Sequence, residues 1–182
     1  MMLDDRRTKL LTRALRHAPY EYALRMDANG WVACAQIVER TGISADALAR
    51  IVDADPKQRF AFNAQCTQVR AQYGHTLSKV RLEYLPTLPP ETLFHGTTRE
   101  RARAIFASEG LRPQRRQYVH LTSNYADAAD VTTRYAGEVC VLAIDARALH
   151  AIGEAFMRAG TSDVWLTRRV PRAYIAEAPC AL

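Results

Sequence analysis

Leu85-Pro-Thr-Leu-Pro-Pro90 holds three of the chain's eight prolines within six residues. Proline lacks a backbone N–H and fixes φ, so neither a helix nor the interior of a sheet can run through this stretch. We interpret residues 85–90 as a stiff linker. It divides the 182 residues into an N-terminal part, residues 1–85, and a C-terminal part, residues 91–182.

Composition places the chain among globular proteins with a modest basic excess. Hydrophobic residues make up 48% and charged residues 24%, which excludes disordered and fibrous classes. The net charge is +6, of which residues 1–90 carry +4 and residues 91–182 carry +2. Most of the basic residues are arginines, which a GC-rich coding bias explains as well as bidentate phosphate binding does. The N-terminal part is the better candidate for binding a polyanion.

Nothing in the sequence points to a membrane, to secretion or to a metal. The longest purely apolar run, Val139–Ile144, is far shorter than the roughly 20 residues of a spanning helix. Charged residues follow the first methionines at once, so no secretory signal is expected. The cysteines lie at least 32 residues apart and form no Cys-x-x-Cys motif: Cys34, Cys66, Cys140 and Cys180. We expect a cytoplasmic monomer with reduced thiols, no metal and no membrane partner.

The N-terminal part has the order helix, small hairpin, two helices and β-wing. Helices are expected over residues 4–17, 34–40 and 44–52, and strands over residues 59–62 and 67–71. Gly42 is placed to end the second helix and Ser44 to cap the third. Asp27-Ala-Asn-Gly30 is a turn signal between short apolar pairs, which predicts the hairpin. This order is typical of a winged helix, although other small α+β domains share it.

Strands and helices alternate in the C-terminal part. Strands are expected over residues 92–95, 118–121, 138–145, 164–166 and 174–176, and helices over residues 97–110 and 124–135. Thr97-Thr-Arg-Glu100 fits a capping box at the start of the first of these helices. No Gly-x-Gly-x-x-Gly motif is present, which excludes a Rossmann or P-loop nucleotide site. The chain as a whole is expected to be α+β.

Arginine and histidine stand together at two places in the N-terminal part. Arg16 and His17 end the first predicted helix, where the helix macrodipole alone favours a cation by about 0.3–1 kcal/mol. Arg70 comes five residues before His75, near the predicted wing, which suits phosphate contact but also fits an ordinary loop. Each pair therefore has a structural explanation beside the functional one, which for Arg16 and His17 is half of a phosphate clamp and for Arg70 and His75 is phosphate contact.

Two further blocks lie in the C-terminal part. In Phe94-His-Gly-Thr97 an imidazole at the end of a strand is followed by glycine, which lets a ligand approach the backbone. Arg116 and His120 are four residues apart, so on a strand both side chains would face the same side. A half-exposed strand face explains that spacing equally well.

Taken together, these blocks resemble the NAD+-dependent RNA 2′-phosphotransferases, enzymes that remove a splice-junction 2′-phosphate from tRNA. The resemblance keeps order and spacing over roughly Leu10 to Tyr174. The matching blocks are Leu15-Arg-His-Ala-Pro19, Asp27-Ala-Asn-Gly-Trp-Val32, Arg59-Phe60, Val69-Arg-Ala71 with Gly74-His-Thr76, Leu93-Phe-His-Gly-Thr97, Arg116 with Val119-His-Leu121, and Val164-Trp-Leu-Thr167 before Val170-Pro171.

The resemblance implies an N-terminal winged-helix lobe for RNA, residues 1–85, and a C-terminal ADP-ribosyltransferase-like lobe for NAD+, residues 91–182. It places four residues around the 2′-phosphate as the catalytic group: Arg16, His17, Arg70 and Arg116. It assigns NAD+ binding to His95, Gly96, Thr97, His120 and Val164. Among these, the two histidines and the valine would fill the signature triad of the transferase fold and hold the nicotinamide riboside.

The implied reaction has two steps, with NAD+ as co-substrate. A 2′-phosphate oxygen attacks C1″ of the nicotinamide ribose and expels nicotinamide. The ribose O2″ then attacks that phosphate and releases RNA with a 2′-hydroxyl, together with ADP-ribose 1″,2″-cyclic phosphate. Converging guanidinium groups would stabilise the charge that develops on the phosphate. His17 would orient the phosphate or transfer a proton, and the scheme requires no metal.

The chain departs from the family's pattern at several positions. Tyr73 stands where glutamine is usual, Ala23 where glycine is usual, and Tyr118 where a histidine is usual. Val131-Thr-Thr-Arg-Tyr-Ala136 replaces a Val-Gly-x-Arg-His-Gly pattern and leaves Arg134 without an assigned role. None of these changes removes a catalytic group, but RNA affinity and the fit of NAD+ would differ.

Two other functions compete with this one. An ADP-ribosyltransferase acting on protein or on nucleic-acid ends would need an acid near the nicotinamide ribose, where this chain has Val164. A non-enzymatic winged-helix regulator would need basic residues along its recognition helix. Residues 44–52 carry only Arg50, opposed by Asp46. Both patterns argue against these alternatives.

Overall fold

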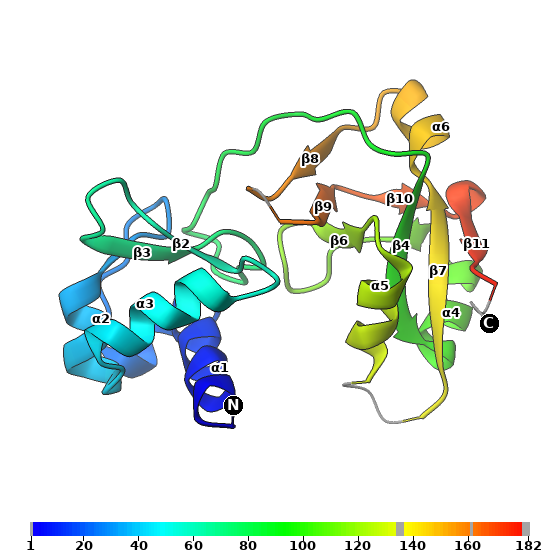
Figure 1. The fold of residues 1–182 in the computed structure, drawn as a ribbon. Helices are drawn as coiled ribbons and strands as arrows, with labels where there is room; N and C mark the ends of the chain where they lie inside the picture. Colours follow the sequence, from blue (N-terminus) through cyan, green and yellow to red (C-terminus); the bar gives the residue numbers. More distant parts are fainter. Residues whose placement is uncertain (1, 134–136, 161, 180–182) are drawn as a thin grey trace. The chain divides into compact units, whose positions relative to one another are not determined.

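The computed structural model describes residues 2–133, 137–160 and 162–179, with the backbone alone for residues 2–4. The described residues fall into two compact units (Figure 1). The first unit reaches to Glu83 and includes Gly160 and Ser162. The second unit holds the rest, from Tyr84 onward. Both contain helices and antiparallel sheet, so the expected mixed class is confirmed.

The first unit combines helices with a three-stranded antiparallel sheet of order β1-β3-β2. Its elements are α1 (Met2–Arg16), a 3-10 helix (Pro19–Tyr22), β1 (Val32–Ala33), α2 (Cys34–Thr41), α3 (Ala45–Ala54), β2 (Phe60–Phe62) and β3 (Gln68–Ala71). Each predicted helix and strand of the wing begins and ends within two residues of its expected position.

Local signals in the sequence explain these boundaries. Gly42 ends α2 with φ 71°, a left-handed conformation that glycine adopts without a Cβ clash. Ser44 caps α3, because its hydroxyl accepts a hydrogen bond from the Ala47 backbone N–H. The apolar stripe of α1 packs into the core of the unit together with Ile37, Leu48 and Val69. The predicted helical face is therefore the buried one.

The small hairpin expected around residues 24–32 does not form. Asp27 does close the predicted turn, since its carboxylate accepts hydrogen bonds from the backbone N–H groups of Asn29 and Trp31. However, β1 pairs with β3, with Val32 opposite Val69, and not with residues 24–26. Pairing there buries both valine side chains completely. The wing consequently has three strands.

The second unit is built on a six-stranded antiparallel sheet of order β11-β7-β4-β6-β9-β8. Its strands are β4 (Thr92–Thr98), β5 (Gly110–Leu111), β6 (Val119–Thr122), β7 (Val139–Asp145), β8 (Phe156–Arg158), β9 (Val164–Thr167), β10 (Val170–Pro171) and β11 (Ile175–Glu177). Its helices are α4 (Arg99–Ala107), α5 (Tyr125–Thr132), α6 (Ala146–Ala151) and a 3-10 helix (Arg172–Tyr174). The short elements β5, α6, β8 and β10 were not predicted.

Two boundaries in this unit differ from the expectation. β4 pairs with β7 along its whole length, so it continues to Thr98. Thr98 and not Thr97 is then the helix cap, and its hydroxyl accepts a hydrogen bond from the Arg101 backbone N–H at 3.2 Å. Gly110 does not end α4 but lies in β5, where a Cβ would overlap the carbonyl oxygen of Val170. The end of the helix expected over residues 124–135 falls partly outside the described residues.

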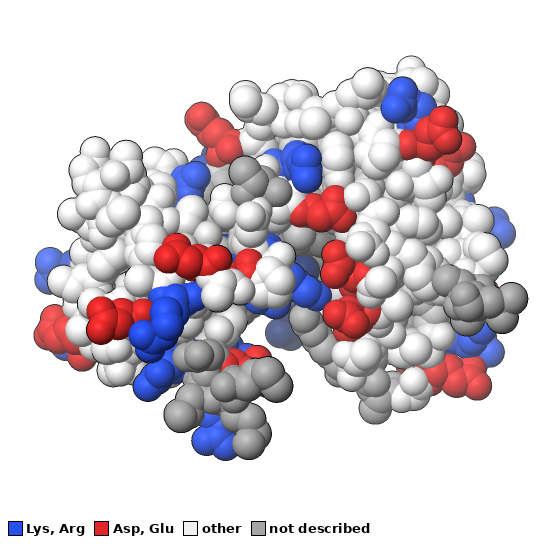
Figure 2. Space-filling view, viewed as in Figure 1, with Lys and Arg blue, Asp and Glu red and all other residues white. Residues whose placement is uncertain are grey.

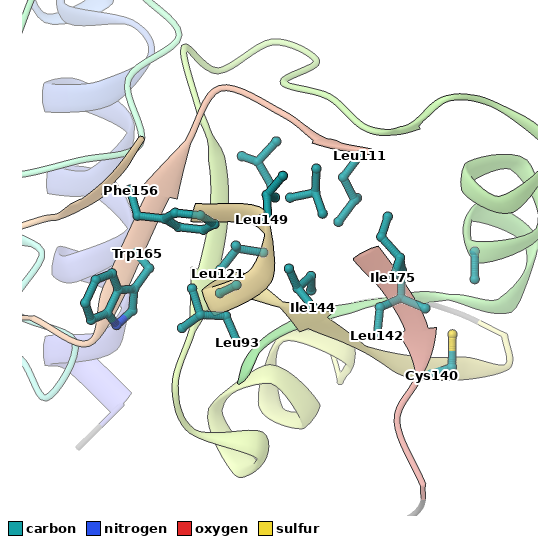
Figure 3. Packing of buried hydrophobic residues seen from close by; sticks show 14 residues of the cluster. Leu93, Leu111, Leu121, Cys140, Leu142, Ile144, Leu149, Phe156, Trp165 and Ile175 are labelled. Atoms are coloured by element: carbon teal, nitrogen blue, oxygen red, sulfur yellow. The ribbon is translucent and has the colours of Figure 1, made fainter. Parts of the chain in front are cut away.

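One apolar cluster forms the core of the second unit (Figure 3). Leu93 and Ile144 come from the paired strands β4 and β7, and both are fully buried. Leu149 of α6 and Phe156 of β8 pack in the same cluster. α6 thus packs onto the same core as β4 and β7.

The proline-rich stretch, which we expect to be a stiff linker over residues 85–90, is grouped with the second unit. The ring of Tyr84 lies edge-on to Tyr118 with centroids 5.7 Å apart. The Thr87 backbone N–H donates to the Phe156 carbonyl at 2.8 Å, and Pro86 forms a bridge with Met157. Residues 86 and 87 therefore run beside β8, held there by the Thr87 N–H and the Pro86 bridge.

The surface shows no separation of charge on the face in Figure 2, where acidic and basic side chains are intermingled. None of the helices in the described residues is long and apolar enough to cross a membrane. Cys34, Cys66 and Cys140 are free thiols, while Cys180 lies outside the described residues.

Candidate functional site

The first unit brings Arg16, His17, Arg70 and His75 together. Arg16 ends α1, Arg70 lies on β3, and His75 follows in the turn after β3. The Thr76 backbone N–H donates to the Arg16 carbonyl at 3.0 Å, and His17 Nδ1 lies 3.1 Å from Thr76 Oγ1. These bonds tie the end of the helix to the turn. We call the four residues the basic cluster.

The basic cluster has the electrostatics of an anion site. Burial, followed by the positive charges of Arg16, His17 and Arg70, lowers the pKa of His75 from its usual 6.5 to about 4. His75 is therefore neutral at pH 7. Every charged group in the described chain that shifts this pKa is basic. Convergence of this kind is unfavourable unless an anion binds, because like charges at short range repel.

Buried atoms of the cluster without a hydrogen-bond partner among the described residues include His75 Nε2 and Arg70 Nε. A buried polar atom left in that state costs about 1–3 kcal/mol. A ligand that accepts from the guanidinium group would recover part of that cost. The unmet donor of Arg70 therefore points to an acceptor that the described residues do not supply.

Each arginine of the cluster lies against an aromatic ring. Arg16 Cζ is 4.5 Å from the ring centroid of Tyr73, and Arg70 Cζ is 4.4 Å from that of Trp31. Tyr73 is buried, and its hydroxyl donates to the Lys57 carbonyl at 2.7 Å. These contacts restrict the movement of both guanidinium groups.

In the second unit, a pocket of about 590 Å³ is lined by His95, Thr97, Arg116 and His120. Its size lies within the roughly 300–1,000 Å³ range of small-molecule sites. Further arginines line it as well: Arg101, Arg112 and Arg115. The pocket therefore combines two imidazoles with a basic wall, which suits a ligand that carries phosphate groups.

The two histidines of this pocket are fixed by backbone carbonyls. His95 Nδ1 donates to the His120 carbonyl at 3.0 Å, and His120 Nδ1 donates to the Tyr118 carbonyl at 3.0 Å. Since a carbonyl can only accept, Nδ1 carries the proton in both rings, and Nε2 is the acceptor of the neutral form. Burial lowers the pKa of His95, and the charge of Arg116 acts in the same direction against the raising effect of the hydrogen bond.

Two of the predicted NAD+-binding residues do not line this pocket. Gly96 faces α5, where an added Cβ would overlap the carbonyl oxygen of Ala128. Close packing of α5 on β4 thus explains the glycine without a ligand. Val164 pairs with Thr122 in the β6–β9 ladder and is also absent from the lining. Their binding roles stay predictions.

Arg116 is not on a strand, which corrects the expected strand geometry. β6 begins at Val119, and Arg116 is exposed in the preceding loop. The stretch before Val119 contains Pro113 and no alternation of apolar residues, so nothing there favours a strand. Arg116 and His120 still line the same pocket. Of the four predicted catalytic residues, Arg116 belongs to the second unit and the other three to the first.

The structure adds three residues that the sequence did not single out as members of the site. The sequence pairs His75 with Arg70, but no pattern in a single sequence predicts that His75 is buried beside Arg16 and His17. Trp31 belongs to one of the matching blocks, and Tyr73 is a departure from the family's pattern. Their contacts with arginine depend on how β3 packs against its neighbours. Arg134 lies outside the described residues. In the part of the chain that the structure describes, no three His, Cys, Asp or Glu side chains are grouped as a metal site requires.

Comparison with known proteins settles the family. The model of the family described as "RNA 2'-phosphotransferase, Tpt1 / KptA family" matches residues 3–169. The chain belongs to this family. That span contains every predicted site residue, from Arg16 to Val164. The resemblance based on short blocks is thereby confirmed.

Relatives in the Tpt1/KptA family match the chain over most of its length. A protein of Pseudomonas aeruginosa (strain UCBPP-PA14) named "Probable RNA 2'-phosphotransferase" is 38% identical over 181 residues, which is 97% of each chain. A protein of the same name from Acaryochloris marina (strain MBIC 11017) is 35% identical and covers 93% of this chain and 94% of its own. Another protein of that name, from Hyperthermus butylicus, is 37% identical, and the match covers 91% of this chain and 76% of its own.

The structure shows what one departure from the expected Tpt1/KptA pattern does. Ala23, at the position where glycine is usual, has φ 50° and ψ 34°, the left-handed conformation. Its backbone N–H donates to the Tyr20 carbonyl and closes the 3-10 helix that follows Arg16 and His17. The alanine therefore keeps the backbone path of a glycine and accepts the strain of its own Cβ.

Proposed function

We propose that this chain transfers an internal RNA 2′-phosphate, as at a tRNA splice junction, to NAD+. The products would be RNA with a 2′-hydroxyl, nicotinamide and ADP-ribose 1″,2″-cyclic phosphate, formed through a 2′-phospho-ADP-ribosylated RNA intermediate. The observation that carries the proposal is the basic cluster, where two guanidinium groups and His17 surround a neutral buried imidazole. The names of its relatives support RNA 2′-phosphotransfer, while NAD+ rests on the resemblance and on the fit of the second unit's pocket.

Each unit is assigned one substrate. We assign RNA to the first unit, as a winged-helix lobe, on the strength of its paired helices, three-stranded wing and basic cluster. We assign NAD+ to the second unit, as an ADP-ribosyltransferase-like lobe. Its pocket has the size for a nucleotide ligand, arginines for a diphosphate, and imidazole Nε2 atoms that can accept from ribose hydroxyls. NAD+, when bound, supplies the electrophilic ribose carbon.

The residues of the basic cluster have the chemistry for phosphate transfer. Arg16 and Arg70 keep a positive charge at any physiological pH and can donate to phosphate oxygens. Losing one such group costs on the order of 10²–10³ in rate in comparable oxyanion sites. We assign His17, whose Nδ1 lies 3.1 Å from Thr76 Oγ1, to orient the phosphate or to move a proton. Arg116, exposed beside the second unit's pocket, completes the proposed catalytic group.

The test is incubation with a short RNA that carries one internal 2′-phosphate, with and without NAD+, followed by gel separation and mass spectrometry. We expect NAD+-dependent loss of the phosphate and release of the cyclic phosphate. The same RNA with a 2′-hydroxyl is the control and should not react. Accumulated ADP-ribosylated RNA would show that the first step runs and the second is impaired. Absence of any reaction would contradict the proposal and favour the transferase or regulator alternatives.

A further inference from the structure

Both arginines of the basic cluster are backed by aromatic rings, and neither ring has a role in the reaction described above. We propose that Tyr73 and Trp31 are positioning residues, which hold the guanidinium groups of Arg16 and Arg70 in place for one phosphate group. This inference rests on the proposed function, since the phosphate is that of the RNA substrate.

The Tyr73 contact is held at both ends. Its ring lies 4.5 Å from Arg16 Cζ, and its hydroxyl is anchored to the Lys57 carbonyl at 2.7 Å. The next residue, Gly74, has φ 85°, and a Cβ there would come within 3.1 Å of Arg16 Nη1. The guanidinium group therefore lies between an anchored ring and a bare stretch of backbone.

The Trp31 contact depends on the turn that begins at Asp27. Trp31 exchanges two backbone interactions with Asp27: its N–H donates to the carboxylate at 2.8 Å, and its carbonyl accepts at 3.1 Å. The same turn presents the Asn29 carbonyl, 3.5 Å from Arg70 Nη1. The turn therefore fixes the ring and one edge of the guanidinium group together, while Arg70 Nε is left buried with a donor to spare.

An aromatic ring suits this position better than a carboxylate does. A carboxylate would hold a guanidinium group firmly, but it would also cancel the charge that the phosphate needs. A ring attracts the cation through its quadrupole and adds no net charge. In the described chain no ion pair involves Arg70, and all charged neighbours that shift His75 are basic. The rings thus orient the arginines and preserve the positive potential of the site.

The experiment compares binding of two RNA oligonucleotides, one with an internal 2′-phosphate and its 2′-hydroxyl twin, at fixed salt and without NAD+. The variants are Tyr73→Leu and Trp31→Leu, with Tyr73→Phe and Trp31→Phe as matched controls that keep a ring. Typical cation–π energies convert to about 3- to 30-fold in an equilibrium constant. We expect the leucine variants to lose that much of the preference for the phosphorylated RNA and the phenylalanine variants to keep it. A general structural defect would weaken binding of both RNAs alike.

A melting temperature for each variant shows whether it is folded. Tyr73 is buried, so Tyr73→Leu can fail to fold. In that case the comparison of Trp31→Leu with Trp31→Phe tests the inference, since Trp31 is only half-buried. Folded leucine variants with the wild-type preference would overturn the inference, and so would phenylalanine variants that lose as much as leucine. If the wild type binds both RNAs equally, the proposed function fails as well, and that result appears before any variant is compared.

Discussion

The two units present their basic groups in different ways. In the first, Arg16 is buried at the end of a helix, Arg70 lies on a strand, and each meets an aromatic ring. In the second, Arg116 is exposed in a loop, and the ordered polar groups are His95 and His120, each bonded to a backbone carbonyl. One unit fixes its cations and the other fixes its imidazoles.

This difference has an energetic consequence. Immobilising a flexible side chain on binding costs about 0.5–1.5 kcal/mol. For the basic cluster much of that cost has been met during folding, so phosphate binding there should depend strongly on single residues. For an exposed arginine such as Arg116 the cost falls at binding. Substitutions of Arg70 in the first unit and of His95 in the second should therefore separate phosphate effects from NAD+ effects.

The largest expected effect is that of Arg70→Ala. Removing a fixed guanidinium group from the transferred phosphate should lower kcat by about 10²–10³-fold. NAD+ affinity, which we assign to the other unit, should change little. Single-turnover kinetics on the 2′-phosphorylated RNA and a separate NAD+ titration measure the two quantities. Arg50→Ala, which removes an exposed arginine of α3 outside the cluster, is the control and should retain activity. Equal losses in transfer and in NAD+ affinity would contradict the assignment.

Gly96→Ala tests whether Gly96, a predicted NAD+-binding residue, is needed for the packing of α5 on β4 and not for binding NAD+. The added methyl group would meet the Ala128 carbonyl, which is backbone and cannot turn aside. We expect the free energy of unfolding of the second unit to fall by about 3 kcal/mol, the upper end for overpacking. Chemical unfolding measures this, and Gly42→Ala, where nothing lies near the added Cβ, separates steric overlap from backbone strain. Unchanged stability with weakened NAD+ binding would restore the ligand role of Gly96.

More of the fold than of the site can be predicted from the sequence. The helices of the first unit follow from patterns that are local, such as the Ser44 cap and the αL glycine at position 42. The pairing of β1 with β3 is not local, because residues 32 and 69 meet only through the fold. The same holds for the contact of Arg16 with Tyr73. The family resemblance selected Arg16 and Arg70, which the structure places in one unit beside His75. Nothing in one sequence could predict the aromatic contacts that hold them.

Acidification should destabilise the first unit through His75. Its pKa is about 4 in the folded chain and near 6.5 when unfolded, so between these values only the unfolded chain takes up the proton. The free energy of unfolding therefore has its full value above pH 6.5 and falls as the pH is lowered toward 4. Between pH 7 and pH 5 this amounts to about 2 kcal/mol. Urea unfolding at several pH values, followed by Trp31 fluorescence in a Trp165→Phe background, should show a shallower pH dependence for His75→Gln. Parallel curves would contradict the burial of a neutral imidazole.

His95→Ala should have the opposite selectivity to Arg70→Ala. Loss of a ring that is fixed by the His120 carbonyl removes one hydrogen-bonding group from the second unit's pocket. We expect NAD+ affinity to fall about tenfold, the value of one hydrogen bond. Binding of 2′-phosphorylated RNA in the absence of NAD+ should be retained. Isothermal titration of NAD+ gives the first quantity, and unchanged NAD+ affinity would remove His95 from the proposed NAD+ site.

Ala23→Gly should have the smallest effect, and we expect it to raise the free energy of unfolding. Ala23 has φ 50°, where an L-residue with a Cβ is strained, while glycine is not. The strain relieved exceeds the added flexibility of the unfolded chain, so the free energy of unfolding should rise by about 0.5–1 kcal/mol. For a chain of this size that corresponds to an increase of about 1–4 °C in Tm. Ala49→Gly, inside α3, is the matched control and should lower stability by about 1 kcal/mol. A lower Tm for Ala23→Gly would mean that the 3-10 helix after His17 depends on the methyl group, and that this segment is held by packing as closely as the basic cluster beside it.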